Sequence, residues 1–380
     1  SANYPEPLYS SPSFTPTRQG VAIMTSPDSG DISTIDMQTG NIVDTITIKK
    51  QGYTFINVFT LVGDHSEEDI AIAVTFQCEI ISFVLTPNKI EVKKVLTKFD
   101  VSTTCHESWM AADGSGIFAT TQGQLLYVDI EDVTLLWKAP FPLIENISGK
   151  YDRFGVALSD RVIVPGCSGL ECYVTSRDYF GSVLWISSSL APSMPEKFDG
   201  ENVSFYFSSG AATADEETYL VVLDAIACDD DDDSSAVYVR QVNAIDILSG
   251  DVKWTADLEF ATQCDDITQL VLLENPSEYP NTPYLIIVYA YANLYCFSPS
   301  GELLWVENCK FNEISSVLPD GRILMTNGHY YSQSGQLLGE IDRNMTPTVG
   351  SILSGGFVDR DMNTFFSLPG ETNVHHGNSA

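Results

Sequence analysis

The sequence predicts an all-β protein in which one four-stranded unit recurs along a single domain. Short runs of β-branched and aromatic residues, separated by Gly, Asp, Ser and Pro, fill the 380-residue chain, and no segment keeps a helical period over three turns. A strand, a tight turn and a second strand recur, most clearly at Ala244–Trp254, again at Ile32–Val43, Leu294–Trp305 and Tyr330–Leu338, and more loosely at Leu126–Trp137 and Cys172–Trp185. Four of the five tryptophans, Trp137, Trp185, Trp254 and Trp305, end the fourth strand of their unit.

Grouping the strands around this hairpin gives units of about forty to fifty residues, which is the period of a propeller blade. Seven units are expected, at residues 11–48, 55–96, 108–138, 153–187, 203–258, 267–306 and 314–341. A large flat side chain at the end of a fourth strand can pack between neighbouring blades. The sequence therefore predicts a single β-propeller over residues 1–370, followed by a polar tail at 371–380.

Both ends of the chain carry strands that fit no complete unit. Strands are expected at Thr348–Leu353, Gly356–Asp359 and Thr364–Leu368 without a fourth, and Pro5–Ser10 remains at the other end. A ring can close when one terminus supplies the outer strand of the other terminus's blade, which removes an exposed edge. We therefore expect eight blades, the last built from both ends. Seven blades is the alternative, with the C-terminal strands merging into blade one.

The hairpin Ala244–Trp254 resembles the repeat of pyrroloquinoline-quinone-type, quinoprotein-like propellers, in which a strand, a Thr/Ser-Gly turn and a terminal Trp recur in each blade. The match covers six or seven units. Phe154–Ala157 leading to Val162–Gly166 also faintly resembles the FG-GAP blades of integrin-like propellers. Quinone sites in the first family contain a Ca²⁺ held by Glu, Asn and Asp, a catalytic Asp, and often adjacent cysteines. This chain has no adjacent cysteines, so the resemblance implies a member without the quinone cofactor, and it concerns fold only.

The charge balance restricts the class of partner. The chain has 19 basic and 51 acidic residues, a net charge of −32. Such a surface repels nucleic acid and anionic lipid, and it suits divalent cations, basic or neutral partners, or simple solvation outside the cell. No apolar run approaches the ~18–20 residues that span a bilayer.

Several features predict a secreted chain. It begins at Ser1, as after removal of a signal peptide, and Asn146, Asn202 and Asn344 begin N-glycosylation sequons. The cysteine count of eight is even, which in an exported protein indicates disulfides. From sequence proximity we expect the pairs Cys167–Cys172, Cys78–Cys105, Cys228–Cys264 and Cys296–Cys309. Buried free thiols are the alternative.

Most of these cysteines fall in loops at one end of the predicted ring. In a blade with strands A to D, the B–C and D–A connections emerge together, and elaborate loops are where binding sites usually lie. The same loops hold an acidic cluster: Asp229, Asp230, Asp231, Asp232, Asp233, Asp265 and Asp266. Two or three of these carboxylates could coordinate Ca²⁺, although a solvated acidic loop is the favoured explanation of the run.

Catalytic candidates are few. His106 lies on the loop-rich end, and His329 begins a strand beside Tyr330. A His/Tyr pair can act as base and acid in polysaccharide cleavage, but a histidine in a turn or a packed strand needs no catalytic role. The leading hypothesis is a secreted, disulfide-braced, acidic glycoprotein that binds other extracellular proteins, copies of itself or glycans as a scaffold, with Ca²⁺ assistance and no other cofactor. The alternative is an extracellular polysaccharide lyase or hydrolase, or a quinone-type dehydrogenase, with its site on the B–C and D–A loops.

Overall fold

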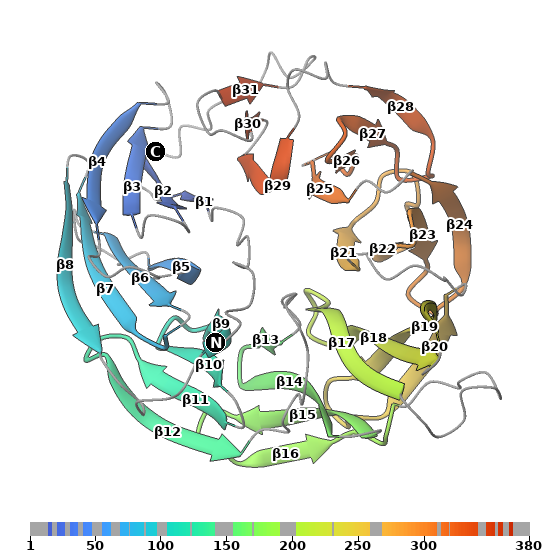
Figure 1. Ribbon diagram of the computed structural model, residues 1–380, viewed down its shortest axis with the longest axis horizontal. Helices are drawn as coiled ribbons and strands as arrows, with labels where there is room; N and C mark the ends of the chain where they lie inside the picture. Colours follow the sequence, from blue (N-terminus) through green and yellow to red (C-terminus); the bar gives the residue numbers. More distant parts are fainter. Residues whose placement is uncertain are drawn as a thin grey trace.

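The computed structural model describes residues 14–16, 21–26, 31–36, 41–47, 55–61, 69–75, 77–86, 89–96, 105–121, 124–140, 155–168, 171–190, 203–229, 232–258, 268–309, 313–318, 320–340, 347–353, 356–359 and 365–367. These residues form eight antiparallel sheets, numbered here in chain order, that follow one another around a circle (Figure 1). The first strand of each sheet lies nearest the centre of the circle and the last lies at its rim. The prediction of an all-β chain of four-stranded units is confirmed for sheets 1 to 7.

The strands of the first four sheets are β1 (Phe14–Pro16), β2 (Val21–Ser26), β3 (Asp31–Asp36) and β4 (Ile42–Thr47); β5 (Phe55–Leu61), β6 (Asp69–Thr75), β7 (Ile80–Thr86) and β8 (Lys89–Leu96); β9 (Cys105–Met110), β10 (Gly116–Thr121), β11 (Gln124–Asp129) and β12 (Thr134–Pro140); and β13 (Val156–Ala157), β14 (Arg161–Ser168), β15 (Glu171–Asp178) and β16 (Val183–Ile186). Each sheet pairs its strands in sequence order, so consecutive strands are joined by hairpins.

The remaining sheets contain β17 (Val203–Ala212), β18 (Thr218–Asp229), β19 (Asp232–Asp246) and β20 (Val252–Asp257); β21 (Gln269–Glu274), β22 (Tyr284–Ala290), β23 (Asn293–Phe297) and β24 (Leu303–Asn308); β25 (Ile314–Val317), β26 (Ile323–Met325), β27 (His329–Tyr331) and β28 (Leu337–Glu340); and β29 (Pro347–Leu353), β30 (Gly356–Asp359) and β31 (Phe365–Ser367). Sheet 8 has three described strands, as expected, and β29 lies beside β25 and β1. The Pro5–Ser10 segment that was expected to complete it lies outside the described residues.

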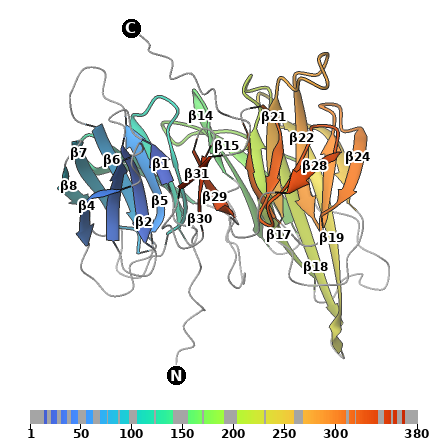
Figure 2. The ribbon, with the colours of Figure 1, turned by 90° about the horizontal axis from the view of Figure 1, so that it is seen from above.

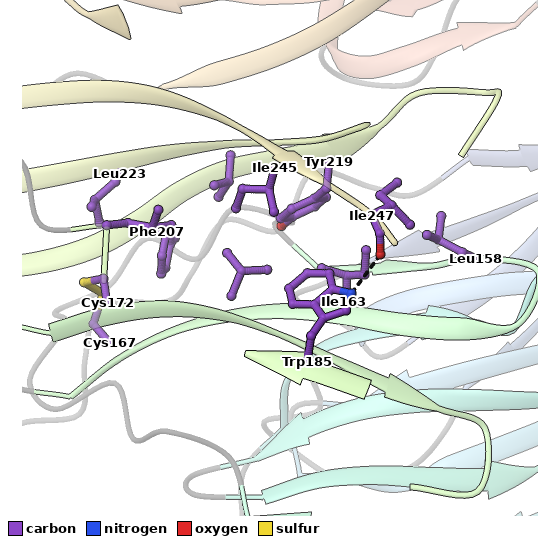
Figure 3. Close-up of a cluster of buried hydrophobic side chains, with 13 residues drawn as sticks. Leu158, Ile163, Cys167, Cys172, Trp185, Phe207, Tyr219, Leu223, Ile245 and Ile247 are labelled. Atoms are coloured by element: carbon purple, nitrogen blue, oxygen red, sulfur yellow. Dashed lines mark hydrogen bonds between the residues drawn. A yellow bond between two sulfur atoms is a disulfide. The ribbon is translucent and has the colours of Figure 1, made fainter. Parts of the chain in front are cut away.

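The core is divided among the junctions between neighbouring sheets. Each buried apolar cluster draws its side chains from two consecutive sheets, from sheets 1 and 2 through to sheets 6 and 7. At the junction of sheets 4 and 5, for example, Ile163 and Val174 pack with Tyr219 and Leu223 (Figure 3). Burying one such aliphatic side chain contributes about 1.5–3 kcal/mol, so packing between sheets holds the ring together.

The recurring turn has a local cause that the sheet 5 copy shows well. Asp246 Oδ1 accepts hydrogen bonds from the backbone N–H groups of Leu248 and Ser249, at 3.0 and 2.9 Å. Gly250 then adopts a φ of +79°, which residues with a Cβ adopt at a cost. The Asp and the Gly therefore fix the turn that leads into the outer strand.

The four outer-strand tryptophans join successive sheets, which confirms the packing predicted for them. Each ring lies against a glycine in the third hairpin of the next sheet: Trp137 on Gly181, Trp185 on Gly250, Trp254 on Gly301, and Trp305 on Gly335. Each indole N–H donates to a backbone carbonyl of that hairpin, at 2.7, 2.8, 2.9 and 3.0 Å in the same order. Figure 3 shows Trp185 donating to Ile247 across the junction. We call these four contacts the tryptophan junctions.

Candidate binding face

Two disulfides lie at one end of the ring. The chain reverses at the second hairpin of every sheet and crosses to the next sheet after the fourth strand, so both connections emerge at the same end. Cys78, in the β6–β7 turn, bonds to Cys105 at the start of β9, with Cα atoms 4.9 Å apart. This bond links sheet 2 to sheet 3 covalently. We call this end of the ring the disulfide end.

The second disulfide closes a hairpin. Cys167 in β14 lies opposite Cys172 in β15, and the two are bonded with Cα atoms 4.0 Å apart. Both side chains are buried against Phe207 and Leu223 of sheet 5 (Figure 3). The sequence predicted both this pair and Cys78–Cys105, and the structure confirms both.

The predicted pair Cys296–Cys309 is wrong, because the two residues are not bonded to each other and both thiols are buried. In the ladder Asn293 lies opposite Asn308, so Cys309 is level with Ala292, whose carbonyl oxygen is 3.1 Å from its Sγ. Cys296 is four residues further along β23, or about 13 Å away at the rise of a strand. Bridged cysteines have Cα atoms within about 7 Å. Burial raises the pKa of the Cys296 thiol to about 12, which keeps it protonated.

The predicted pair Cys228–Cys264 and the acidic cluster fall largely outside the described residues. Cys264, Asp230, Asp231, Asp265 and Asp266 lie outside them entirely, whereas Cys228, Asp229, Asp232 and Asp233 are described in backbone only. The described parts of the chain contain no group of three His, Cys, Asp or Glu residues placed to hold a metal ion. The Ca²⁺ site therefore stays a prediction.

Asp229, Asp232 and Asp233 of the acidic cluster lie on a long hairpin. β18 and β19 extend to Asp229 and Asp232, which lie opposite each other. Figure 2 shows that this hairpin projects beyond the other sheets, and as the second hairpin of its sheet it does so at the disulfide end. The unit at residues 203–258 is thus enlarged by an arm made of strands.

A buried ion pair anchors the base of this arm. Asp224 in β18 lies opposite Arg240 in β19, with Nε 3.0 Å from Oδ1, and both side chains are nearly inaccessible to solvent. The Arg240 guanidinium lies 4.2 Å from the ring centre of Tyr291, in the β22–β23 turn of sheet 6. Burial raises the pKa of Asp224 despite the neighbouring guanidinium. Removing one member of such a pair would leave a buried, uncompensated charge, so the arm is fixed to sheets 5 and 6 at its base.

The catalytic candidates are placed far apart. His106 belongs to β9, an inner strand of sheet 3, and its side chain lies outside the described set. His329 begins β27, the third strand of sheet 7, on the opposite side of the ring (Figure 1). Its Nε2 lies 3.7 Å from a carboxylate oxygen of Glu340 on the outer strand. Tyr330 follows on the other face of β27, where its ring is 5.5 Å from the Arg322 guanidinium. The structure does not bring His106 and His329 to one site.

Two buried groups, Glu107 and Tyr219, were missed by sequence reasoning. Glu107 is buried on β9, next to His106, and Tyr219 is buried on β18. Burial, and after it the charge of Glu107, raises the pKa of Tyr219. Nothing in the local sequence distinguishes a buried glutamate from the many exposed ones. The sequons at Asn146, Asn202 and Asn344 all lie outside the described residues.

Comparisons with known proteins agree on the fold. No protein-family model and no curated protein sequence matches the chain. Among solved structures, BamB from Moraxella catarrhalis is similar with a TM-score of 0.57 and 15% identity, over 88% of this chain and 89% of BamB. The C-terminal WD40 domain of Sif2 gives a TM-score of 0.53 and 9% identity, over 84% of this chain and 80% of that domain.

The chain is a β-propeller. Kuenenia stuttgartiensis hydrazine synthase is similar as well, with a TM-score of 0.50, 10% identity and 78% of each chain covered. At these identities the propeller's likeness to other proteins concerns fold alone, which agrees with the resemblance to quinoprotein-like repeats. Among the described residues, no helix has the length and apolar character needed to cross a membrane.

Proposed function

We propose that the chain is a secreted, eight-bladed β-propeller that serves as a binding or scaffold module in an extracellular assembly. The observation that carries this proposal is the disulfide end, where two disulfides and the projecting β18–β19 arm emerge together. Disulfides persist in oxidising compartments. Propeller relatives in structure commonly mediate protein contacts, and loops on a rigid scaffold are the usual place for them.

The partner is proposed to be neutral or basic. A net charge of −32 favours such a protein over nucleic acid or an anionic membrane. Asp229, Asp232 and Asp233 place negative charge at the end of the arm. Ca²⁺ bound there would reduce repulsion between copies of the chain, so calcium-assisted self-association belongs to the same proposal.

Site-specific photo-crosslinking tests the proposal. A photoreactive residue would replace Asp232 at the tip of the arm, and a control would replace Ser300 in the exposed β23–β24 turn at the opposite end of the ring. We expect one identified extracellular protein, or a second copy of the chain, to crosslink from position 232 and not from position 300. Light scattering with Ca²⁺ or with a chelator distinguishes self-association. Equal crosslinking from both positions, or recovery of the chain from the cytosol with Cys78 and Cys105 reduced, would contradict the proposal.

A further inference from the structure

The outer strand of sheet 4 differs from the other outer strands in charge. Each of the seven described four-stranded sheets ends in an outer strand, and proteins commonly place charges on such strands to prevent edge-to-edge pairing. Six of these strands follow that rule, with Asp44 in β4; Lys89, Glu91, Lys93 and Lys94 in β8; Lys138 in β12; Lys253 and Asp257 in β20; Glu307 in β24; and Glu340 in β28. β16 has no charged residue, and none occurs from Tyr179 to Pro195. In a chain with 51 acidic residues, this is a local exception.

The side chains of β16 are apolar and exposed. Val183, Leu184 and Ile186 have exposed fractions of 47%, 45% and 59%, and Phe180 in the preceding turn reaches 89%. Trp185 already fills the contact with sheet 5. The packing of the ring therefore does not account for these four side chains.

β16 also has backbone N–H and C=O groups that face away from β15. Ser187 donates its N–H to Val174 of β15, and the direction of backbone groups alternates along an antiparallel strand. The N–H and C=O groups of Ile186 therefore point away from β15. Because Asp178 donates its N–H to the C=O of Ser182, the same holds for Val183. Leu184 is the extra residue of the bulge between these positions, where the alternation is interrupted. No strand among the described residues pairs with this edge of β16. Val183 and Ile186 thus combine exposed apolar side chains with outward backbone groups, which is what an added β-strand requires.

Charge decides between the candidate occupants of this edge. A second copy would bring another net charge of −32 to the contact. Acidic side chains lie at both ends of the adjoining strand β15, at Glu171 and Asp178. Arg177 directly precedes Asp178 in the chain. Its guanidinium donates to the backbone carbonyls of Gly181 and Pro140. A basic residue at each end of an incoming strand would complement Glu171 and Asp178, which are seven residues or about 23 Å apart along the strand.

We propose that β16 accepts an extended, apolar strand with basic flanks from another protein, which adds to sheet 4 as a fifth strand. This proposal deepens the proposed binding function by assigning a second surface, on the rim rather than at the disulfide end. Its test uses a synthetic peptide, so that a negative result would leave the role of the disulfide end untouched.

The probe is a fluorescent peptide of about nine residues, in which valine and threonine alternate between terminal lysines, a length set by the rise per residue of a strand. Fluorescence anisotropy measures its affinity for the full chain and for the variants Leu184→Lys and Ile186→Lys. The matched control is Leu338→Lys, because Leu338 occupies the position in β28 that Leu184 occupies in β16 and is equally exposed, at 46% against 45%. We expect saturable binding that falls at least tenfold in both β16 variants and is unchanged in the control.

Hydrogen exchange locates the bound peptide, which should slow exchange at the amides of Val183 and Ile186 in the wild-type chain. A peptide with terminal glutamates should bind at least tenfold more weakly. Three results would overturn the proposal: no saturable binding to the wild type, equal loss of affinity in the Leu338→Lys control, or a wild-type dimer that Leu184→Lys dissociates. If one β16 variant unfolds at a lower temperature than the wild type, the other gives the comparison.

Discussion

The tryptophan junctions predict a specific coupling between Trp185 and Gly250. A Cβ added at Gly250 would lie 2.6 Å from Cε3 of the Trp185 ring, and the residue has a φ of +79°. Gly250→Ala therefore carries two costs: about 1–2 kcal/mol for the left-handed backbone and about 1–3 kcal/mol for displacing the ring. Trp185→Ala removes the ring and its hydrogen bond to Ile247, which we expect to cost about 3–5 kcal/mol.

The double variant separates the two costs of the alanine. Without the indole, the added Cβ meets no ring, so Gly250→Ala should cost only its backbone strain in the Trp185→Ala background. The two changes together should therefore destabilise the protein by about 1–3 kcal/mol less than the sum of the single changes. Equilibrium urea unfolding followed by far-ultraviolet circular dichroism measures this, because that signal does not depend on the deleted tryptophan.

Gly301 supplies the matched control, since its added Cβ would meet Trp254 and not Trp185. Gly301→Ala has a similar φ of +83° and should be additive with Trp185→Ala to within about 0.5 kcal/mol. If Gly250→Ala is equally additive, the ring does not rest on Gly250 in solution and the account of the junction is refuted.

Three further predictions concern bonds and titrating groups. Replacing Cys78 and Cys105 by serine opens a disulfide with a sequence separation of 27, and it should lower the free energy of unfolding in urea by about 3.5 kcal/mol. Opening Cys167–Cys172, whose separation is 5, should lower it by about 2 kcal/mol, because a shorter loop restricts the unfolded chain less. The reverse order would contradict this argument. Cys296 and Cys309 should resist iodoacetamide in the folded protein and react fully in denaturant, as read by mass spectrometry, because both thiols are buried; rapid labelling of the native protein would refute this. Asp246→Ala should cost about 1 kcal/mol at pH 7 through loss of its turn hydrogen bonds. The Ser249 N–H and Lys253 lower the pKa of Asp246 below 3.8 in the folded protein. The cost of Asp246→Ala should therefore be constant above pH 5 and vanish as the pH falls through the pKa of Asp246 in the folded protein. A cost that persists at the lowest pH would show that the carboxylate charge is not involved.

Repetition is what made the fold predictable. Short runs of β-branched and aromatic residues are separated by regular turns, and the same hairpin recurs, so an error in one unit is corrected by the others. The Trp position was visible because four units share it. The two confirmed disulfides were predictable for a different reason. Cys167 and Cys172 flank one hairpin, and Cys78 and Cys105 lie at connections that emerge at the same end of the ring.

The pair Cys296–Cys309 failed because strand direction and register override proximity in sequence. The Asp224–Arg240 ion pair was missed for a related reason. Counting back evenly from the pair Asp229 and Asp232 would place Asp224 opposite Val237. An irregularity in the ladder between Ala227 and Asp229 shifts the register by three residues and brings Arg240 opposite Asp224. No local pattern in the sequence indicates this shift.

Strand pairing also identifies, in each of sheets 1 to 7, the outer-strand residue that is equivalent to the junction tryptophan. The chemistry of this residue differs from sheet to sheet. In sheets 3 to 6 this position is Trp, next to a bulge in the ladder, whereas register places Asp44 in sheet 1, Lys94 in sheet 2 and Gly339 in sheet 7. Asp44 Oδ2 accepts the backbone N–H of Ile90 in sheet 2 at 2.9 Å, so the outer strand still reaches the next sheet, now as acceptor instead of donor. Between sheets 2 and 3, where the position holds Lys94, the Cys78–Cys105 bond joins the sheets covalently. Because a search for repeated tryptophans finds only the first kind of junction, the units before Trp137 look degenerate in sequence although they join their neighbours by other means.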